Sequence, residues 1–216
     1  MTLENRSAFA DIAKNRNPAE VLPKKAVDPI IEVYFQINHL KQLYRRGWLR
    51  DNRVSEAQCE SVADHCFGMM ILAILIIDRF AIRVDLLKVA RMIVLHELGE
   101  IYGGDITPLD DISDEEKYRI EYESVKRVFE TYPGGERYVE EWEEFEAKQT
   151  KEAKFVAQLD KLEMTFQGAV YQLQHGSDFS AFFESAGRAI RSDKLAGLFN
   201  EISDLVKQAT TVVLTT

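Results

Sequence analysis

The segment from Arg91 to Pro108, RMIVLHELGEIYGGDITP, places one imidazole and two carboxylates at the end of an apolar helix. Four apolar residues precede His96, and Glu97 and Glu100 follow it within about one turn. Side chains three and four apart lie on the same side of a helix, so we expect Glu100 to lie beside both His96 and Glu97. Burying such groups is costly unless an opposite charge compensates them. A divalent cation would supply that charge.

Two glycines predict the end of this helix. Gly103 and Gly104 follow the acidic residues, and glycine readily adopts the left-handed conformation that ends many helices. Asp105 comes directly after them, in a turn that Thr107 and Pro108 close. Taken alone, an aspartate at such a position is a common turn residue. Asp105 therefore becomes a site candidate only through its neighbours.

Two further candidate ligands lie on other expected helices. His65 stands in the first turn of one, and Asp160 lies at the edge of the apolar stripe of another. Each alone has a structural explanation, as a core histidine or an ion-pair partner. Together with His96 and Glu97 they form a mixed nitrogen and oxygen donor set, which suits a hard or borderline divalent cation with open positions for water. Such a cation activates water for attack on an electrophile near neutral pH.

A series of amphipathic helices must position these residues. The pattern of apolar spacing and capping residues predicts them at about 29–44, 61–80, 86–102, 114–132, 136–149, 150–174, 178–190 and 193–208. The second of these is apolar nearly all round, which predicts a central and buried position. The sequence therefore predicts an all-α chain, with a polar N-terminal arm at 1–27 and one helical bundle at 28–210 that has the metal site in its centre.

Composition limits the partners. A chain of 216 residues is long enough for one domain with a substantial core. Its net charge of −9 and the lack of a basic stripe argue against a nucleic-acid polymer, which is bound by neutralising its phosphates. A single phosphate group could still be held by a metal and one or two arginines.

We also expect neither a membrane span nor a signal peptide in this sequence. The most apolar run, from Cys66 to Ile77, is shorter than the ~20 residues that a membrane span requires, so we expect no membrane partner. The N-terminal segment has no apolar stretch typical of a signal peptide. Cys59 and Cys66 show neither metal-binding nor disulfide spacing, which predicts free thiols and a cytoplasmic location.

The order His65, His96–Glu97, Asp160 resembles the H…HD…D signature of the HD-domain superfamily of metal-dependent phosphohydrolases. The resemblance is closer to one branch, the 5′-deoxynucleotidases of the YfbR type and of the HD domain-containing protein 2 type. The matching segments follow that branch's order from about residue 30 to 200: RRGW at 45–48, ESVADH at 60–65, HELGEIYGGDITP at 96–108, EEKYR at 115–119 and EAKFVAQLDKLEM at 152–164.

This resemblance implies an enzyme with an all-α HD fold that hydrolyses 5′-deoxyribonucleoside monophosphates to deoxynucleoside and phosphate, as a homodimer. It implies a divalent cation, one of Mn, Co, Mg, Fe, Ni or Zn. Glu100 matches the acidic residue that orients or deprotonates the attacking water. The residues that match the metal ligands are His65, His96, Glu97 and Asp160.

The resemblance also implies the residues that meet the substrate. Asp105 matches the aspartate of a Gly–Asp turn at the substrate and is assigned both a catalytic and a binding role. Arg45 matches an arginine on the phosphate side, with Arg46 as a neighbouring alternative. Trp48 matches an aromatic residue that crowds the 2′ position of the sugar and so disfavours ribonucleotides.

One position departs from the signature. The superfamily pairs His with Asp, whereas this chain has His96–Glu97. Glutamate keeps the charge and the donor atoms and is one methylene longer, so it can ligate with a folded rotamer or bidentately. If it does not, Glu100 takes its place or the site is weaker. Two alternatives therefore stay open: a hydrolase of another small organophosphate or phosphodiester, and a non-catalytic domain that binds metal or nucleotide.

Overall fold

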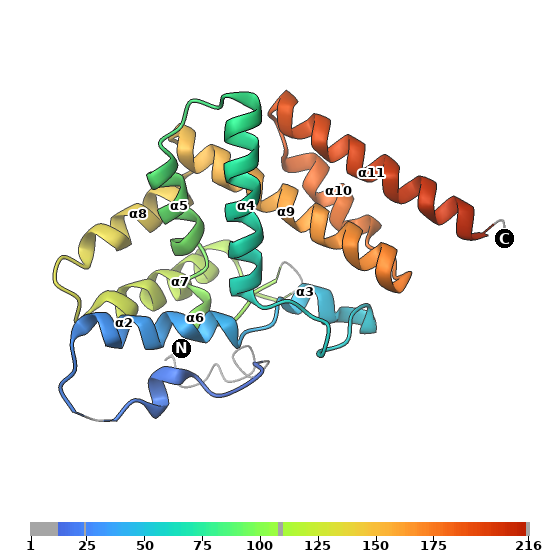
Figure 1. Cartoon of the computed structure of the whole chain (residues 1–216). Coiled ribbons are helices and arrows are strands. Elements are labelled where there is room, and N and C mark those ends of the chain that lie inside the picture. The colour runs from blue at the N-terminus through green and yellow to red at the C-terminus, as the bar shows by residue number, and fades with distance from the viewer. Residues whose placement is uncertain (1–12, 24, 108–109, 215–216) are drawn as a thin grey trace.

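The described residues form an all-α fold of helices joined by short turns (Figure 1). The structure is a computed structural model that describes residues 13–23, 25–107 and 110–214, with side chains to residue 209. Extended pairing in this part of the chain is limited to isolated bridges, such as that of Ala13 with Leu43. The elements are, in chain order, η2 (Pro18–Val21), α2 (Pro29–Ile37), η3 (Asn38–Lys41), α3 (Arg46–Leu49), η4 (Arg50–Asn52), α4 (Val62–Phe80), α5 (Leu86–Leu95), α6 (Glu100–Gly103), α7 (Asp114–Phe129), α8 (Glu136–Ala147), α9 (Lys151–His175), α10 (Ser180–Ala189) and α11 (Asp193–Leu214).

Side-chain caps explain where most of the long helices begin. A cap oxygen satisfies one of the backbone N–H groups that the first turn of a helix leaves without a partner. Such a cap residue precedes each of α2, α4, α5, α7 and α9. In that order, the cap residues are Asp28, Ser61, Asp85, Ser113 and Thr150.

The first helix is shorter than predicted, because α2 gives way to the 3₁₀ helix η3 at Asn38.

The helix predicted at 86–102 is wrong in one respect, because it is broken into α5 and α6. In the intervening turn the N–H groups of Leu98 and Glu100 bond to carbonyls three residues back, rather than four. A Cβ atom on Gly99 would lie 2.5 Å from the Cβ of Glu121. Helix α7 thus packs directly on the turn, and only glycine fits there. The prediction that glycine ends the segment is confirmed, since Gly104 follows α6 with φ 76°.

Helix α9 is the common packing partner of the core. In Figure 1 it passes behind α4, with α5 and α8 near its first turns and α10 and α11 along its second half. Apolar side chains of α4, α5 and α9 form one buried cluster, and a second cluster joins α2, η3, α6 and α7. The first cluster takes Met69 and Ile93 from α4 and α5, whereas the second takes Val62 and Leu95 from the same helices. The boundary between the clusters therefore crosses the first turns of α4 and the last turn of α5.

The prediction that α4 is buried all round is wrong. Phe67 is 69% exposed, and Ile71, Ile74 and Leu75 are exposed as well. The other elements pack on the remaining sides of the helix, through α5, α9 and η3. None of the described helices is long and apolar enough to cross a lipid bilayer.

Part of the predicted N-terminal arm contacts the bundle. The N–H of Lys14 donates to the carbonyl of Gln42 at 2.7 Å. Asn17 is buried and caps η2 through its side chain. Residues 1–12 of the arm lie outside the described residues, and the boundary between arm and domain stays a prediction.

Candidate metal centre and active site

Two buried imidazoles meet at the boundary between the core clusters. His65 comes from the first turns of α4 and His96 directly follows α5, and their ring centroids are 5.7 Å apart. The Nδ1 of His96 lies 2.9 Å from the carbonyl oxygen of Ile93. Because a carbonyl can only accept, Nδ1 is the donor, and in the neutral ring Nε2 then presents a lone pair that can bind a cation. Neither Nε2 has a hydrogen-bond partner among the described residues.

Two carboxylates face these nitrogen atoms. Oε1 of Glu97 lies 3.5 Å from Nε2 of His65 and 3.3 Å from Nε2 of His96. The longer side chain at position 97 therefore reaches both imidazoles. Asp160, from the middle of α9, places Oδ1 3.3 Å from Nε2 of His65. His65, His96 and Glu97 each offer a donor atom within 4.8 Å of the others, and Asp160 adjoins this trio at His65.

The predicted ligands fit a divalent cation. Buried imidazole nitrogens without partners are costly, and a cation would satisfy them together with the carboxylates. Burial opposes the charge on Glu97, but His96 and Arg45 outweigh it and hold its pKa well below the usual range. Burial also opposes the charge on Asp160, where Lys161 and the nearby histidines likewise keep the pKa well below the usual range. Both carboxylates are therefore ionised and able to bind a metal.

The guanidinium of Arg45 lies close to three carboxylates at this site. Its Nη1 is 2.9 Å from Oε1 of Glu97, 3.7 Å from Oε1 of Glu100 and 4.0 Å from Oδ1 of Asp105. Burial, followed by the charges of Glu97 and Asp105, raises the pKa of Glu100 well above its usual range. Its Oε2 is buried and has no hydrogen-bond partner in the described part of the chain. A carboxyl group with a raised pKa beside candidate metal ligands is suited to proton transfer.

Arg46, the alternative to Arg45, points elsewhere. Its Nη1 donates to the backbone carbonyl of Asp105 at 2.7 Å, and its guanidinium makes two bonds of 3.2 Å to the carboxylate of Asp110. The N–H of Arg46 also donates to Oδ2 of Asp105. Arg46 therefore holds the turn after α6 against α3. Arg45 is the arginine whose guanidinium faces Glu97 and Glu100.

Trp48 lies in an aromatic cluster beside the charged site. Its ring is 2% exposed and stacks on Phe182 at a centroid distance of 4.5 Å, with Tyr171 and Phe179 at its edges. Its Nε1 donates to Oε1 of Glu60 at 2.7 Å. The structure thus does not bring Trp48 into the group of candidate ligands, and its role against a 2′-hydroxyl stays a prediction.

Three residues near the site were not predicted. Glu163 places Oε2 2.6 Å from Nδ1 of His65, and its spacing from Asp160 on one helix was the available signal. Lys117 and Glu121 come from α7, and the electrostatic influence of both reaches Glu97. Nothing local marks this pair, because it approaches only through the packing of α7 on Gly99.

We expect Glu121 to make the stability of the metal-free protein depend on pH. Burial raises the pKa of Glu121 to about 7, although Lys117 opposes the rise from 3.6 Å away. Between its ordinary value of 4.5 and 7 the folded protein holds a proton that the unfolded chain has released. The contribution of Glu121 to stability is therefore fully present below pH 4.5 and is lost as the pH rises from 4.5 through 7. Glu121→Gln should reduce this loss by roughly 1–3 kcal/mol of unfolding free energy.

Urea titrations in EDTA at pH 5, 6.5 and 8 measure this effect. Parallel stability curves for Glu121→Gln and the unmodified chain would contradict the assignment. Glu123, an exposed glutamate of the same helix, provides the control, because Glu123→Gln should leave the pH dependence unchanged.

Comparison with known proteins agrees with this geometry. Residues 37–202 match the HD domain family. The chain is 34% identical to human 5′-deoxynucleotidase HDDC2 over 77% of its length and 80% of that protein. It is 33% identical to 5′-deoxynucleotidase YBR242W of Saccharomyces cerevisiae over 80% of its length and 71% of that protein. A crystal structure described as a predicted metal-dependent phosphohydrolase from Magnetospirillum magnetotacticum shares the fold, with a TM-score of 0.67 and 24% identity over 84% of this chain and 92% of that one. The match over most of the chain shows that it belongs to the HD domain family.

Proposed function

We propose that this protein is a metal-dependent 5′-deoxynucleotidase, which hydrolyses 5′-deoxyribonucleoside monophosphates to a deoxynucleoside and phosphate. The observation that carries the proposal concerns the Nε2 atoms of His65 and His96. They have no hydrogen-bond partner in the described part of the chain, and they lie close to the carboxylates of Glu97 and Asp160, directly beside Arg45. The substrate class is supported by relatives named 5′-deoxynucleotidase in animals, a slime mould and yeasts.

The residues divide the work of breaking the P–O5′ bond. A divalent cation held by His65, His96, Glu97 and Asp160 would polarise a phosphoryl oxygen and activate water. Arg45 donates paired hydrogen bonds to the phosphate and offsets its charge, as its planar guanidinium allows. Glu100 accepts a proton from the attacking water at Oε2 and can return it to O5′ of the leaving deoxynucleoside.

Asp105, in the turn after α6, lies close enough to Arg45 to position its guanidinium. Its Oδ2 accepts the N–H of Arg46, and its Oδ1 lies 4.0 Å from Nη1 of Arg45. Asp105 can therefore orient the guanidinium of Arg45 towards the phosphate. Its own contact with the substrate is part of the proposal.

A phosphate-release assay tests the proposal directly. We expect turnover of dAMP, dGMP and dTMP with Mn²⁺ or Co²⁺, little turnover of AMP, and loss of activity in EDTA. Turnover of a phosphodiester in place of the monophosphates would support the alternative hydrolase. Metal binding without any turnover would support the non-catalytic alternative, and either result would overturn the proposal.

We propose that this activity is cytoplasmic. Cys59 is buried and Cys66 is half-buried, and both are free thiols. Free thiols persist in reducing compartments. The net charge of −9 further supports a small nucleotide, rather than a nucleic-acid polymer, as the partner.

We also propose that two copies of the chain pair through an apolar strip on α4, made of Phe67, Ile71, Ile74 and Leu75. All four side chains are exposed, and large exposed apolar patches mark interaction surfaces. The sequence from 65 to 77 contains no Asp, Glu, Lys or Arg. A second copy is the occupant favoured by charge, because two chains of net charge −9 repel each other least where neither carries a carboxylate.

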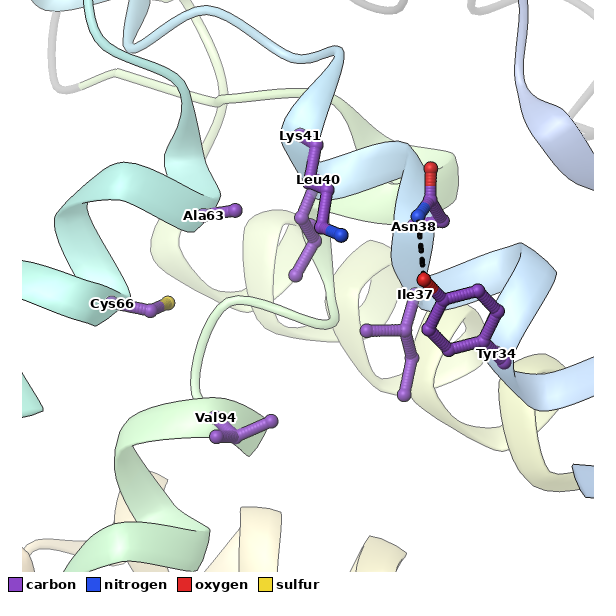
Figure 2. A pocket seen from close by; sticks show the side chains of 8 residues that line it. All are labelled: Tyr34, Ile37, Asn38, Leu40, Lys41, Ala63, Cys66 and Val94. Atoms are coloured by element: carbon purple, nitrogen blue, oxygen red, sulfur yellow. Dashed lines mark hydrogen bonds between the residues drawn. The ribbon is translucent and has the colours of Figure 1, made fainter.

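A depression lined mainly by apolar side chains lies between α2, η3, α4 and α5 (Figure 2), and Cys66 in its lining directly precedes Phe67 of the strip. Ala63 and Cys66 of α4 and Val94 of α5 form one side of it, opposite Ile37 and Leu40. This depression gives an apolar side chain of a second copy a place to pack. A two-fold symmetric pairing would then use the same strip on both chains.

Replacing Phe67 with Glu tests the pairing. We expect light scattering after size exclusion to give about twice the chain mass of 24.8 kDa for the unmodified protein and the single chain mass for Phe67→Glu. Leu205→Glu provides the control, because Leu205, like Phe67, is an exposed apolar residue but lies on α11. A dimer that survives Phe67→Glu would place the interface elsewhere.

A further inference from the structure

We propose that Glu163 is a positioning residue for the metal site, because it holds His65 with Nε2 directed at the cation. This inference rests on the proposed function. Oε2 of Glu163 lies 2.6 Å from Nδ1 of His65, and both side chains are buried. A histidine that binds a cation through Nε2 is neutral and carries its proton on Nδ1, and the carboxylate of Glu163 lies where it accepts that proton in a hydrogen bond.

Helix α9 contacts both nitrogen atoms of the same ring. Asp160 approaches Nε2 at 3.3 Å, whereas Glu163 approaches Nδ1 at 2.6 Å. The two carboxylates are three residues apart on one helix and so lie on the same side of it. The rotation of the His65 ring is therefore restrained at Nδ1 by a residue that is not itself placed among the ligands.

Gly68 provides the space that Glu163 occupies. It lies three residues after His65 on α4, so both positions share one face of that helix. A Cβ atom at position 68 would collide with Oε1 of Glu163 and lie 3.1 Å from its Cδ. Glycine inside a helix costs roughly 0.5–1 kcal/mol relative to alanine. The close approach of the carboxylate explains why this cost is accepted here.

The two imidazoles are thus held by different groups. His96 donates from Nδ1 to the backbone carbonyl of Ile93, which no side-chain substitution removes. His65 depends on the side chain of Glu163 for the equivalent contact. Substitution of such outer partners of ligating histidines typically weakens metal affinity by about 10–100-fold.

The test measures Mn²⁺ affinity by calorimetry and the visible spectrum of the Co²⁺-loaded protein. We expect Glu163→Gln to raise the Kd for Mn²⁺ by about 10–100-fold and to change the Co²⁺ spectrum. At saturating metal we expect kcat to fall while KM for dAMP stays near its original value. Gly68→Ala should weaken Mn²⁺ binding in the same direction, because it displaces the carboxylate without changing its chemistry.

Glu152 provides a matched control on the same helix. Glu152 and Glu163 are both 5% exposed, but Oε1 of Glu152 accepts the N–H of Asp85 at 3.0 Å, at the start of α5. Glu152→Gln should lower the Tm and leave the Kd for Mn²⁺ unchanged. Equal losses of affinity in Glu152→Gln and Glu163→Gln would show a merely structural role and overturn the inference.

The outcomes separate this inference from the proposed function. Mn²⁺ affinity of Glu163→Gln within twofold of the unmodified protein would overturn the positioning role, whatever the substrate. Failure of the unmodified protein to hydrolyse dAMP while binding Mn²⁺ would overturn the proposed function alone, since the affinities still report on Glu163. Absence of Mn²⁺ and Co²⁺ binding to the unmodified protein would overturn both.

Discussion

Replacing His96 with alanine is expected to lower turnover of dAMP by about 10³-fold, because Lewis-acid polarisation is worth several kcal/mol and each ~1.4 kcal/mol is tenfold in rate. The variant loses Nε2 of His96, which lies 3.3 Å from Oε1 of Glu97. Mn²⁺ affinity should fall together with kcat. Single-turnover phosphate release and calorimetry measure the two effects.

His39 is the control for this variant. It is a buried histidine in η3 with no predicted place in the site. We expect His39→Ala to change the Tm but to leave the Kd for Mn²⁺ near its original value. If His96→Ala keeps more than a tenth of the activity, the metal centre is not built on this imidazole.

Arg45→Ala is expected to lower kcat/KM for deoxynucleotides by about 10²-fold, because charged hydrogen bonds contribute roughly 1.5–3 kcal/mol each. Unlike His96→Ala, it should retain Mn²⁺, since it also removes a positive charge from beside Glu97, Glu100 and Asp105. Arg45→Lys keeps the charge but not the paired donors, so we expect it to recover only part of the loss. Steady-state kinetics and calorimetry on the three proteins check this.

A separate comparison shows whether Arg45 acts on the phosphate. A deoxynucleoside lacks the phosphate, so Arg45→Ala should weaken inhibition by a deoxynucleoside much less than it lowers the turnover of dAMP. Equal weakening of both would show that the arginine shapes the pocket and does not bind the phosphate.

Sequence spacing alone predicted most of the long helices and the candidate ligands. Caps such as Asp28 and Thr150 act within one turn of their own helix, so their effect is visible in a few consecutive residues. The same locality made His65, His96 and Asp160 candidates, because each stands on a recognisable apolar face. The structure places donor atoms of His65, His96 and Glu97 within 4.8 Å of one another, and Asp160 adjoins them at His65.

Tertiary packing decided the features that spacing could not predict. The break after α5 follows from the packing of α7 on Gly99, and the exposed strip on α4 from the absence of a covering element among the described residues. The contact of Arg45 with Glu97 spans 52 residues, and that of His65 with Glu163 spans 98. Local propensity says nothing about such pairs, because they form only when helices distant in the chain pack together. The sequence by itself therefore determined the helices and the chemical types at the centre, whereas the tertiary structure decided which arginine faces the carboxylates and which carboxylate holds His65.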